Sequence, residues 1–310
     1  MDIRTTQQSF AVMEGSIPPT TRLGHAHLTV ANLERQLGFY QSVLGFRLHW
    51  RDEGRAGLGA GREDLLRLTE MPEARRVHNT TGMYHFAVLY PSRKELARAI
   101  ARLFALRYPN APTDHVVSQT TYLDDAEGNN IELYIRTPEA GSFEAANGDL
   151  IVRRADGRHS SGRDPLDIED LFRELSPEDR LDLPLPDGTK LGHVHLYAGS
   201  LADSMRFYHE VLGFKKGLVS AAFRMGDVGL SDDQPHVVAF NTWKGEGAPP
   251  PPAGALGMRY FTVVLPDSTA LDQVLTRLRE AGLATELTEE GTLVRDPSQI
   301  AVVLTAPAKS

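Results

Sequence analysis

Two short stretches of the sequence are nearly identical. Residues 23–28 are Leu-Gly-His-Ala-His-Leu, and residues 191–196 are Leu-Gly-His-Val-His-Leu. Residues 82–86, Gly-Met-Tyr-His-Phe, and residues 257–261, Gly-Met-Arg-Tyr-Phe, are weaker versions of the same pattern. Each of the four begins an apolar stretch typical of a β-strand and leads into an amphipathic helical pattern. The chain is therefore predicted to repeat one strand–helix unit four times.

A second match, at the same offset along the chain, supports duplication. Residues 39–46 are Phe-Tyr-Gln-Ser-Val-Leu-Gly-Phe, and residues 207–214 are Phe-Tyr-His-Glu-Val-Leu-Gly-Phe. Four polar residues stand where the four helices should begin and suit the N-cap position: Asn32, Ser92, Ser200 and Ser268. Short apolar segments between turn signals follow each helix and read as three further strands. Each unit is thus predicted to be β-α-β-β-β, in a fold of the α+β class.

Composition excludes several classes of function. The chain has 33 basic and 41 acidic residues, a net charge of −8, which disfavours nucleic acid and anionic membranes as partners. It has no run of about 18 apolar residues, so no membrane span is expected. It also has no cysteine, which fits a cytoplasmic protein and excludes disulfides, zinc–thiolate sites and iron–sulfur clusters. Any metal must therefore be held by histidine and carboxylate.

The repeated strands carry such residues. Because a strand alternates its faces, His25 and His27 point to one side, and so do the histidines of residues 191–196. His85 stands in the apolar strand 83–88, and Glu132 follows a Gly-Asn-Asn turn with apolar neighbours on both sides. A half-buried carboxylate needs a partner. Two histidines and one carboxylate would leave three positions of an octahedral metal open, as in non-haem Fe²⁺ sites.

Several motifs together resemble the vicinal oxygen chelate superfamily. They are Gly-His-x-His-Leu, Phe-Tyr-x-x-Val-Leu-Gly-Phe, Tyr-His-Phe-Ala and Gly-Asn-x-Ile-Glu-Leu-Tyr. That superfamily includes the glyoxalases, the bleomycin-resistance proteins and the type I extradiol dioxygenases. The chain is most similar to the two-domain bacterial catechol 2,3-dioxygenase branch, because residues 241–243, Asn-Thr-Trp, precede a proline-rich segment as they do there.

The resemblance implies an architecture. The four βαβββ units should pair into two curved, open-barrel mixed sheets. The expected division is an N-terminal extension (1–20), a first vicinal-oxygen-chelate domain (21–138), a connector (139–187) and a second such domain (188–306), with two units in each domain. The connector is expected to be partly structured, and its length leaves the units free to pair other than in chain order.

The resemblance also implies metal ligands. His85 and Glu132 would be two of them, and the third would be the histidine directly after glycine in a Gly-His-x-His-Leu strand. Both His25 and His193 qualify. We favour His193, which requires the second unit to pair with the third, because the third unit also contains His236 where extradiol enzymes carry an acid–base histidine. The first unit offers no histidine at that place.

The fourth unit lacks ligands, because alignment places Tyr260 and Val303 where the second unit has His85 and Glu132. One metal site per chain is therefore expected, with the first and fourth units serving as structure. His27 and His195 are expected to support the site or to belong to the core. Tyr122 matches the tyrosine that hydrogen-bonds substrate in extradiol enzymes, and His115 resembles a supporting histidine on the same rim. Where the dioxygenases have a run of histidines before Asn-Thr-Trp, only His236 is present here.

By this resemblance the protein is expected to be an extradiol-type dioxygenase in the breakdown of aromatic compounds, opening a catecholic ring with O₂ and Fe²⁺, or alternatively Mn²⁺ or another divalent cation. His236 would transfer protons, and Tyr122 and His115 would orient the ring. Two alternatives on the same scaffold are a non-oxidative glyoxalase-like isomerase or lyase and a protein that only binds a small molecule. The exposed sheet edges favour a homo-oligomer.

Overall fold

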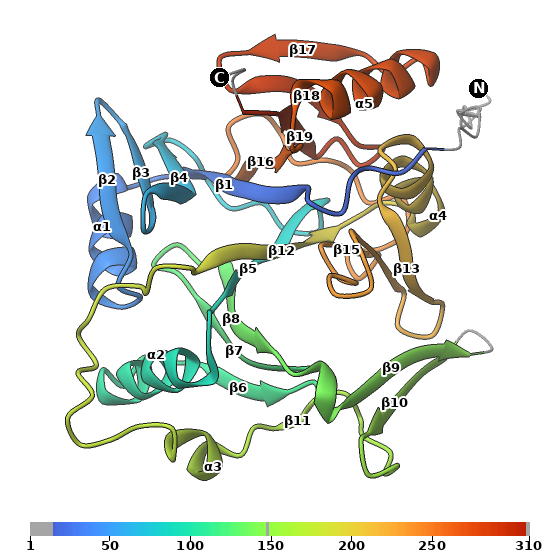
Figure 1. The fold of residues 1–310 in the computed structure, drawn as a ribbon. Coiled ribbons are helices and arrows are strands. Elements are labelled where there is room, and N and C mark those ends of the chain that lie inside the picture. Colours follow the sequence, from blue (N-terminus) through green and yellow to red (C-terminus); the bar gives the residue numbers. More distant parts are fainter. Residues whose placement is uncertain (1–14, 147–148, 308–310) are drawn as a thin grey trace.

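The computed structural model describes residues 15–146 and 149–307, and it shows all four predicted units (Figure 1). Residues 1–14, most of the expected N-terminal extension, lie outside the described part of the chain. The first unit consists of β1 (Arg22–Val30), α1 (Leu33–Ser42), β2 (Arg47–Asp52), β3 (Arg55–Ala60) and β4 (Glu63–Glu70). The second consists of β5 (Gly82–Leu89), α2 (Arg93–Ala105), β6 (Ala111–Asp114), β7 (Ser118–Asp124) and β8 (Asn130–Arg136).

The second half repeats this order. The third unit consists of β12 (Lys190–Tyr197), α4 (Leu201–Met205) with its π-helical continuation (Arg206–Val211), β13 (Lys215–Ser220), β14 (Met225–Gly229) and β15 (Val238–Asn241). The fourth consists of β16 (Gly257–Val264), α5 (Ser268–Glu280), β17 (Thr285–Thr288), β18 (Gly291–Arg295) and β19 (Ala301–Thr305). The connector contains a 3-10 turn (Pro138–Ala140), β9 (Gly141–Ala146), β10 (Asp149–Arg154), β11 (Asp164–Pro165) and α3 (Ile168–Phe172).

The units pair across the two halves of the chain. In the described residues the first sheet runs β17-β18-β19-β16-β1-β4-β3-β2 and joins the first unit to the fourth. The second sheet runs β11-β6-β7-β8-β5-β12-β15-β14-β13 and joins the second unit to the third (Figure 1). Both sheets mix parallel and antiparallel neighbours and remain open, which confirms the predicted α+β architecture. Whether 21–138 and 188–306 behave as separate domains stays a prediction.

Each helix begins where its polar cap stands. The side chains of Asn32, Ser92 and Ser200 accept a hydrogen bond from the backbone N–H three residues on, as expected of N-caps. The fourth helix differs by one position, since Asp267 is the cap and Ser268 is its first helical residue. The carboxylate also places a negative charge at the helix N-terminus, where the helix dipole favours it.

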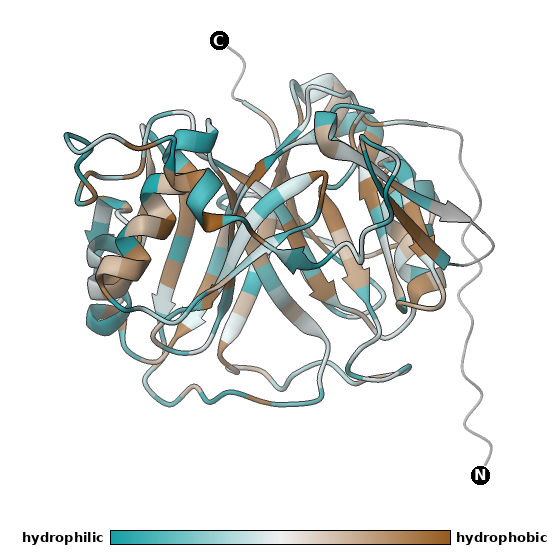
Figure 2. Cartoon of the chain, turned by 90° about the horizontal axis from the view of Figure 1, so that it is seen from below, coloured by the Kyte–Doolittle hydropathy of each residue, from teal (hydrophilic) through white to brown (hydrophobic). Residues whose placement is uncertain are grey.

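The alternation of the repeated strands separates an apolar face from a histidine-lined face. On β1, Ala26 and Leu28 are fully buried in the core, whereas His25 and His27 point to the other side. The helices pack on the core side, α1 on β2, β3 and β4 and α2 on β8. Figure 2 shows apolar positions concentrated along the strands. In the described part of the chain no helix is long and apolar enough to span a membrane.

Two buried tyrosine–aspartate pairs join the sheets. The hydroxyl of Tyr40, on α1 of the first sheet, donates to Asp125 Oδ2 at 2.8 Å, and Asp125 belongs to the turn before β8 of the second sheet. Tyr208 donates to Asp296 Oδ2 at 3.0 Å at the repeat-equivalent place in the other half. Each pair thus links units that are neighbours in the chain but belong to different sheets.

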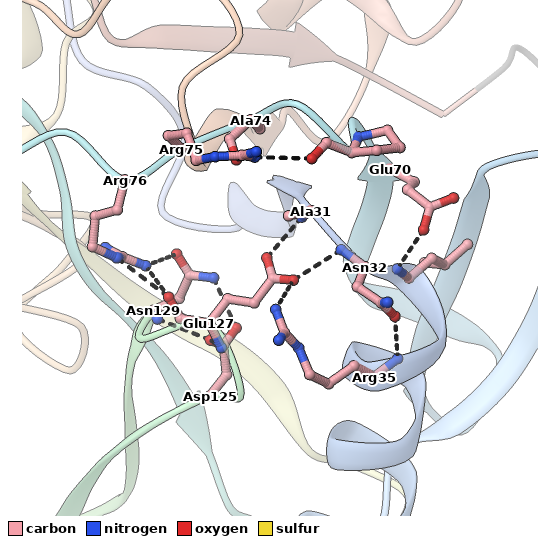
Figure 3. Close-up of polar contacts among 12 residues, drawn as sticks. Ala31, Asn32, Arg35, Glu70, Ala74, Arg75, Arg76, Asp125, Glu127 and Asn129 are labelled. Atoms are coloured by element: carbon pink, nitrogen blue, oxygen red, sulfur yellow. Dashed lines mark hydrogen bonds and ion pairs between the residues drawn. The ribbon is translucent and has the colours of Figure 1, made fainter.

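A carboxylate beside the first pair strengthens this link (Figure 3). The Glu127 side chain, only 1% exposed, accepts hydrogen bonds from the backbone N–H groups of Ala31 and Asn32 at 2.8 and 2.9 Å. Arg35 adds an ion pair at 2.7 Å, and Arg76 holds the same turn by donating to the Glu127 carbonyl. The N-terminus of α1 in one sheet is therefore fixed by a turn of the other.

Candidate metal centre

Strand register brings three of the predicted side chains together. On the second sheet His193 of β12 pairs with Ala87 of antiparallel β5, and Ala87 pairs in turn with Glu132 of parallel β8. His85 lies two residues before Ala87 and so points to the same face. Because the Ala87 side chain is only a methyl group, the three longer side chains can converge above it. We call this histidine-lined face the second-sheet cup.

The converging atoms form a small triangle. Nε2 of His85 and Nε2 of His193 lie 3.2 and 3.0 Å from Oε2 of Glu132, and the two nitrogens are 3.1 Å apart. All three residues are at most 4% exposed. In an octahedral site with bonds of about 2.1 Å, adjacent ligand atoms are about 3.0 Å apart. The triangle thus has the size of one octahedral face, and no other such group of three occurs among the described residues.

Protons alone do not satisfy this triangle. If both Nε2 atoms carry hydrogen and donate to Glu132, the two N–H groups face each other at 3.1 Å. If only one carries hydrogen, the lone pair of the other nitrogen faces the carboxylate. A cation removes the conflict, because all three atoms can then offer lone pairs. The donor set therefore fits a divalent metal.

The protonation states suit the same purpose. Burial lowers the pKa of His193 to about 3, so its imidazole is neutral near pH 7. Burial alone would raise the pKa of Glu132, but the imidazoles of His193 and His85 hold it well below its usual range. A neutral imidazole and an ionised carboxylate are the forms that bind metal.

Steric crowding explains why glycine precedes histidine in the Gly-His motif. A Cβ at Gly192 would lie 2.1 Å from the hydroxyl oxygen of Tyr134, whose ring packs against His193 with centroids 5.0 Å apart. At the equivalent Gly24 a Cβ would lie 2.4 Å from Oγ1 of Thr262. The motif therefore reflects close packing behind the histidine.

His236 lies on the cup side of the sheet. Its ring packs edge-on against His193, with centroids 4.5 Å apart, and its side chain is 34% exposed. Its Nδ1 is hydrogen-bonded to Asp227 Oδ2 at 2.5 Å. Burial alone would lower the pKa of His236, but the carboxylate of Asp227 raises it above its ordinary value.

Tyr122 and His115 form a pair on the opposite rim. Tyr122 pairs across strands with Glu132, and its ring lies 5.6 Å from that of His85. The hydroxyl of Tyr122 is 2.8 Å from Nε2 of His115, whose Nδ1 hydrogen-bonds the carbonyl of Gly162 in the connector. If Nδ1 alone carries hydrogen and donates it to that carbonyl, Nε2 accepts the hydroxyl of Tyr122.

Three aromatic residues near the site were not anticipated from the sequence. A β-bulge in β5, where His85 pairs with His195 but Met83 pairs with Leu196, inserts Tyr84 as an extra residue. The Tyr84 ring lies 5.2 Å from Tyr197 and 5.3 Å from Trp243. Alternation would have placed Tyr84 on the opposite face from His85. The motifs Tyr-His-Phe-Ala and Asn-Thr-Trp contain Tyr84 and Trp243, but neither motif indicates on which face of the sheet its aromatic ring lies.

The second histidine of each Gly-His-x-His-Leu strand contacts a residue of a neighbouring strand. Nε2 of His195 lies 2.8 Å from the amide nitrogen of Asn241, and Nε2 of His27 lies 2.7 Å from Oγ1 of Thr69. Burial lowers the pKa of both imidazoles, so His195 can accept the Asn241 N–H as a neutral ring. Neither histidine belongs to the triangle.

The first sheet places His25 in a different environment. Nε2 of His25 lies 3.0 Å from Oε2 of Glu290, which also accepts the hydroxyl of Tyr260 at 2.6 Å on its other oxygen. The guanidinium of Arg67 pairs with Glu290 at 2.9 Å and with Asp64 at 2.8 Å. A side-chain cation of the chain itself thus balances these carboxylates. His25 is in the other sheet from His85 and Glu132.

Comparisons with known proteins agree with this architecture. The model of the Glyoxalase/Bleomycin resistance protein/Dioxygenase superfamily matches residues 22–133 and 190–304. A catechol-2,3-dioxygenase of Bacillus subtilis (strain 168) is 38% identical over 286 residues, which are 91% of this chain and 96% of that protein.

Solved structures show the same fold. A Bacillus subtilis (subsp. subtilis str. 168) protein proposed to be a dioxygenase matches with a TM-score of 0.63 at 14% identity, covering 95% of this chain and 87% of its own. Glyoxalase I of Zea mays matches with a TM-score of 0.56 at 19% identity and covers 92% of each chain. At these identities the likeness concerns the fold alone. The family model, however, spans most of the sequence, and the chain belongs to the glyoxalase/bleomycin resistance protein/dioxygenase superfamily.

Proposed function

We propose that the protein is an Fe²⁺-dependent extradiol-type dioxygenase that opens the ring of a catecholic substrate with O₂. His85, Glu132 and His193 would be the metal ligands. The observation that carries the proposal is their triangle of donor atoms, 3.0–3.2 Å on each side, on one buried face. The 38% identity with a catechol-2,3-dioxygenase supports this reaction class, because the match covers nearly all of both chains.

Two imidazoles and one carboxylate suit Fe²⁺, and the mixed nitrogen and oxygen set also accepts Mn²⁺. The bound metal would supply Lewis acidity that lowers the pKa of the substrate hydroxyl groups, together with open positions for substrate and O₂. Because a dioxygenase places both oxygen atoms in its product, the reaction needs no external reductant. The residues of the chain then have to bind the ring, orient it and manage its protons.

The arrangement of side chains around the triangle fits those tasks. His236, half open to the cup and packed on His193, is placed to take a hydroxyl proton from a substrate above the triangle. Tyr122, on the opposite rim and oriented by its hydrogen bond to His115, would hydrogen-bond a substrate oxygen and fix its orientation. Tyr84 and Trp243 would form an aromatic wall for the ring.

The proposal is tested with iron-loaded protein and catechol mixed without air. Admission of air should give oxygen uptake and a yellow ring-fission product. In His85→Ala both should disappear together with the iron, because one of the three donor atoms is removed. Stoichiometric iron in that variant would overturn the ligand assignment.

The same experiment separates the alternatives. Bound metal without oxygen uptake, over a panel of diphenols, would indicate a non-oxidative isomerase or lyase on this fold. Absence of bound metal after loading with Fe²⁺ and Mn²⁺ would indicate a protein that only binds a small molecule. Either result would overturn the proposed reaction.

A further inference from the structure

The hydrogen-bond partner of His236 is itself held in place. Asp227 lies on β14, is 8% exposed as a residue, and presents Oδ2 to Nδ1 of His236. Its other oxygen, Oδ1, accepts the backbone N–H of Leu218 at 2.6 Å. Both oxygens of this buried carboxylate are thus occupied, and the group has a fixed orientation.

A glycine makes room for this carboxylate. A Cβ at Gly217, on the neighbouring strand β13, would lie 2.1 Å from Oδ1 of Asp227. Any side chain there would push the carboxylate away from Leu218 and from His236. The sequence around β13 is therefore adapted to the position of Asp227.

The repeated unit itself does not require the pair. Arg67 of the first sheet is equivalent to Ala239 of the second, because they pair with the equivalent histidines His27 and His195. The strand partner of Arg67 is Gly57, whereas that of Ala239 is Asp227, so Gly57 takes the place of Asp227 in the first sheet. His236 lies three residues before Ala239, and Asp64 lies three residues before Arg67, so Asp64 takes the place of His236. The histidine and its carboxylate thus occur together in the sheet that holds the donor triangle and are both replaced in the other.

We propose that Asp227 is a positioning residue that keeps His236 in the tautomer with hydrogen on Nδ1, which leaves the Nε2 lone pair to accept the substrate proton. This inference rests on the proposed function. In the step concerned the substrate O–H bond breaks, its electron pair stays on the substrate oxygen and its proton moves to Nε2 of His236. Asp227 remains ionised and stabilises the resulting imidazolium.

Asp227→Asn tests the proposal with little change in shape. The asparagine oxygen can still accept the Leu218 N–H, which leaves the amide NH₂ facing Nδ1 of His236 and forces the hydrogen to Nε2. Ring-nitrogen NMR on the Zn²⁺-loaded chain reads the tautomer directly, with His236→Gln identifying the signals. We expect hydrogen on Nδ1 in the wild type and on Nε2 in Asp227→Asn. Hydrogen on Nε2 in the wild type would overturn the inference, whether or not the protein proves to be a dioxygenase.

Kinetics with the iron-loaded chain give the second measurement. Asp227→Asn should lower kcat for catechol by about 10²- to 10⁴-fold, the range of a general base, with KM and iron content nearly unchanged. His236→Gln should be similarly slow, and the double variant should be no slower than His236→Gln alone, because Asp227 acts through that ring. A double variant slower by the product of both effects would show that Asp227 acts independently of His236.

Discussion

Replacement of His193 by alanine should abolish metal binding, whereas the same replacement of His25 should not. The two residues follow glycine at equivalent places in the repeat, and they are 4% and 8% exposed. Each substitution therefore removes an imidazole of the same size from an equally buried strand position. They differ in that His193 contacts His85 and Glu132, whereas His25 faces Glu290 of the other sheet. His25→Ala is thus a matched control for the packing cost.

The size of the effect follows from linkage. A metal that binds only the folded chain stabilises it by about 2.7 kcal/mol at a free concentration of one hundred times Kd. With an unfolding entropy of about 2.1 cal/mol/K per residue over 310 residues, each kcal/mol shifts Tm by about 1.5 °C. Metal should therefore raise the Tm of the wild type by about 4 °C. The same rise is expected in His25→Ala and none in His193→Ala at that metal concentration.

Differential scanning calorimetry with and without Mn²⁺ measures the metal-induced rise in Tm for all three proteins. Mn²⁺ is used because it is stable in air. Metal analysis after gel filtration gives the number of metal ions per chain. We expect one in the wild type, one in His25→Ala and none in His193→Ala. Loss of the rise in His25→Ala would place the third ligand in the other sheet. Full occupancy in His193→Ala would show that the triangle in the second sheet is not the metal site.

Three further predictions concern single side chains. Tyr122→Phe should keep its iron but lower kcat/KM for catechol by roughly tenfold to a hundredfold in steady-state assays, the equivalent of one hydrogen bond to a charged group; an unchanged value would remove Tyr122 from the site. Burial raises the pKa of Asp296 from 3.8 to about 6, so its stabilisation is complete below pH 4 and is lost as the pH rises through 6. Relative to Asp296→Asn, urea unfolding should show the wild type losing about 3 kcal/mol between pH 4 and 7, and parallel pH profiles would contradict this. Tyr40→Phe, which removes the donor to buried Asp125, should lower the free energy of unfolding by about 1.5–3 kcal/mol, and a loss below about 0.5 kcal/mol would deny the pair a role in joining the sheets.

The units were predictable from the sequence because both of their signals are local. Alternation around His85 and Glu132 places each side chain on a definite face of its strand, and cap residues such as Asn32 mark where helices begin. The pairing of units has no local signal. Any two copies of one repeat offer similar apolar strands to each other, so only an asymmetry between copies can indicate the pairing. His236, present in the third unit and absent from the first, was such an asymmetry.

The features that the sequence did not predict depend on register and on turns. Tyr84 reaches the cup side because a bulge breaks the alternation of β5, and a bulge shifts which residue faces its partner. Glu290 reaches His25 from the turn between β17 and β18 rather than from a strand. Asp227 is recognisable as a partner of His236 only once β14 and β15 are known to be adjacent. Each case involves residues whose proximity is set by tertiary pairing.

Each sheet holds a carboxylate beside a histidine, and the two sheets neutralise its negative charge in different ways. In the first sheet a carboxylate reaches His25, and burial alone would raise the pKa of Glu290, yet neighbouring His25, Tyr260 and Arg67 lower it to about 2. The guanidinium of Arg67 supplies the positive charge between Glu290 and Asp64 from within the chain. In the second sheet Ala239 stands at the place of Arg67, and the ion-pairing partners of Glu132 among the described residues are the imidazoles of His85 and His193. A buried carboxylate that lacks a guanidinium or ammonium partner is stabilised by a bound cation, and for that reason we propose a metal site in the second sheet and none in the first.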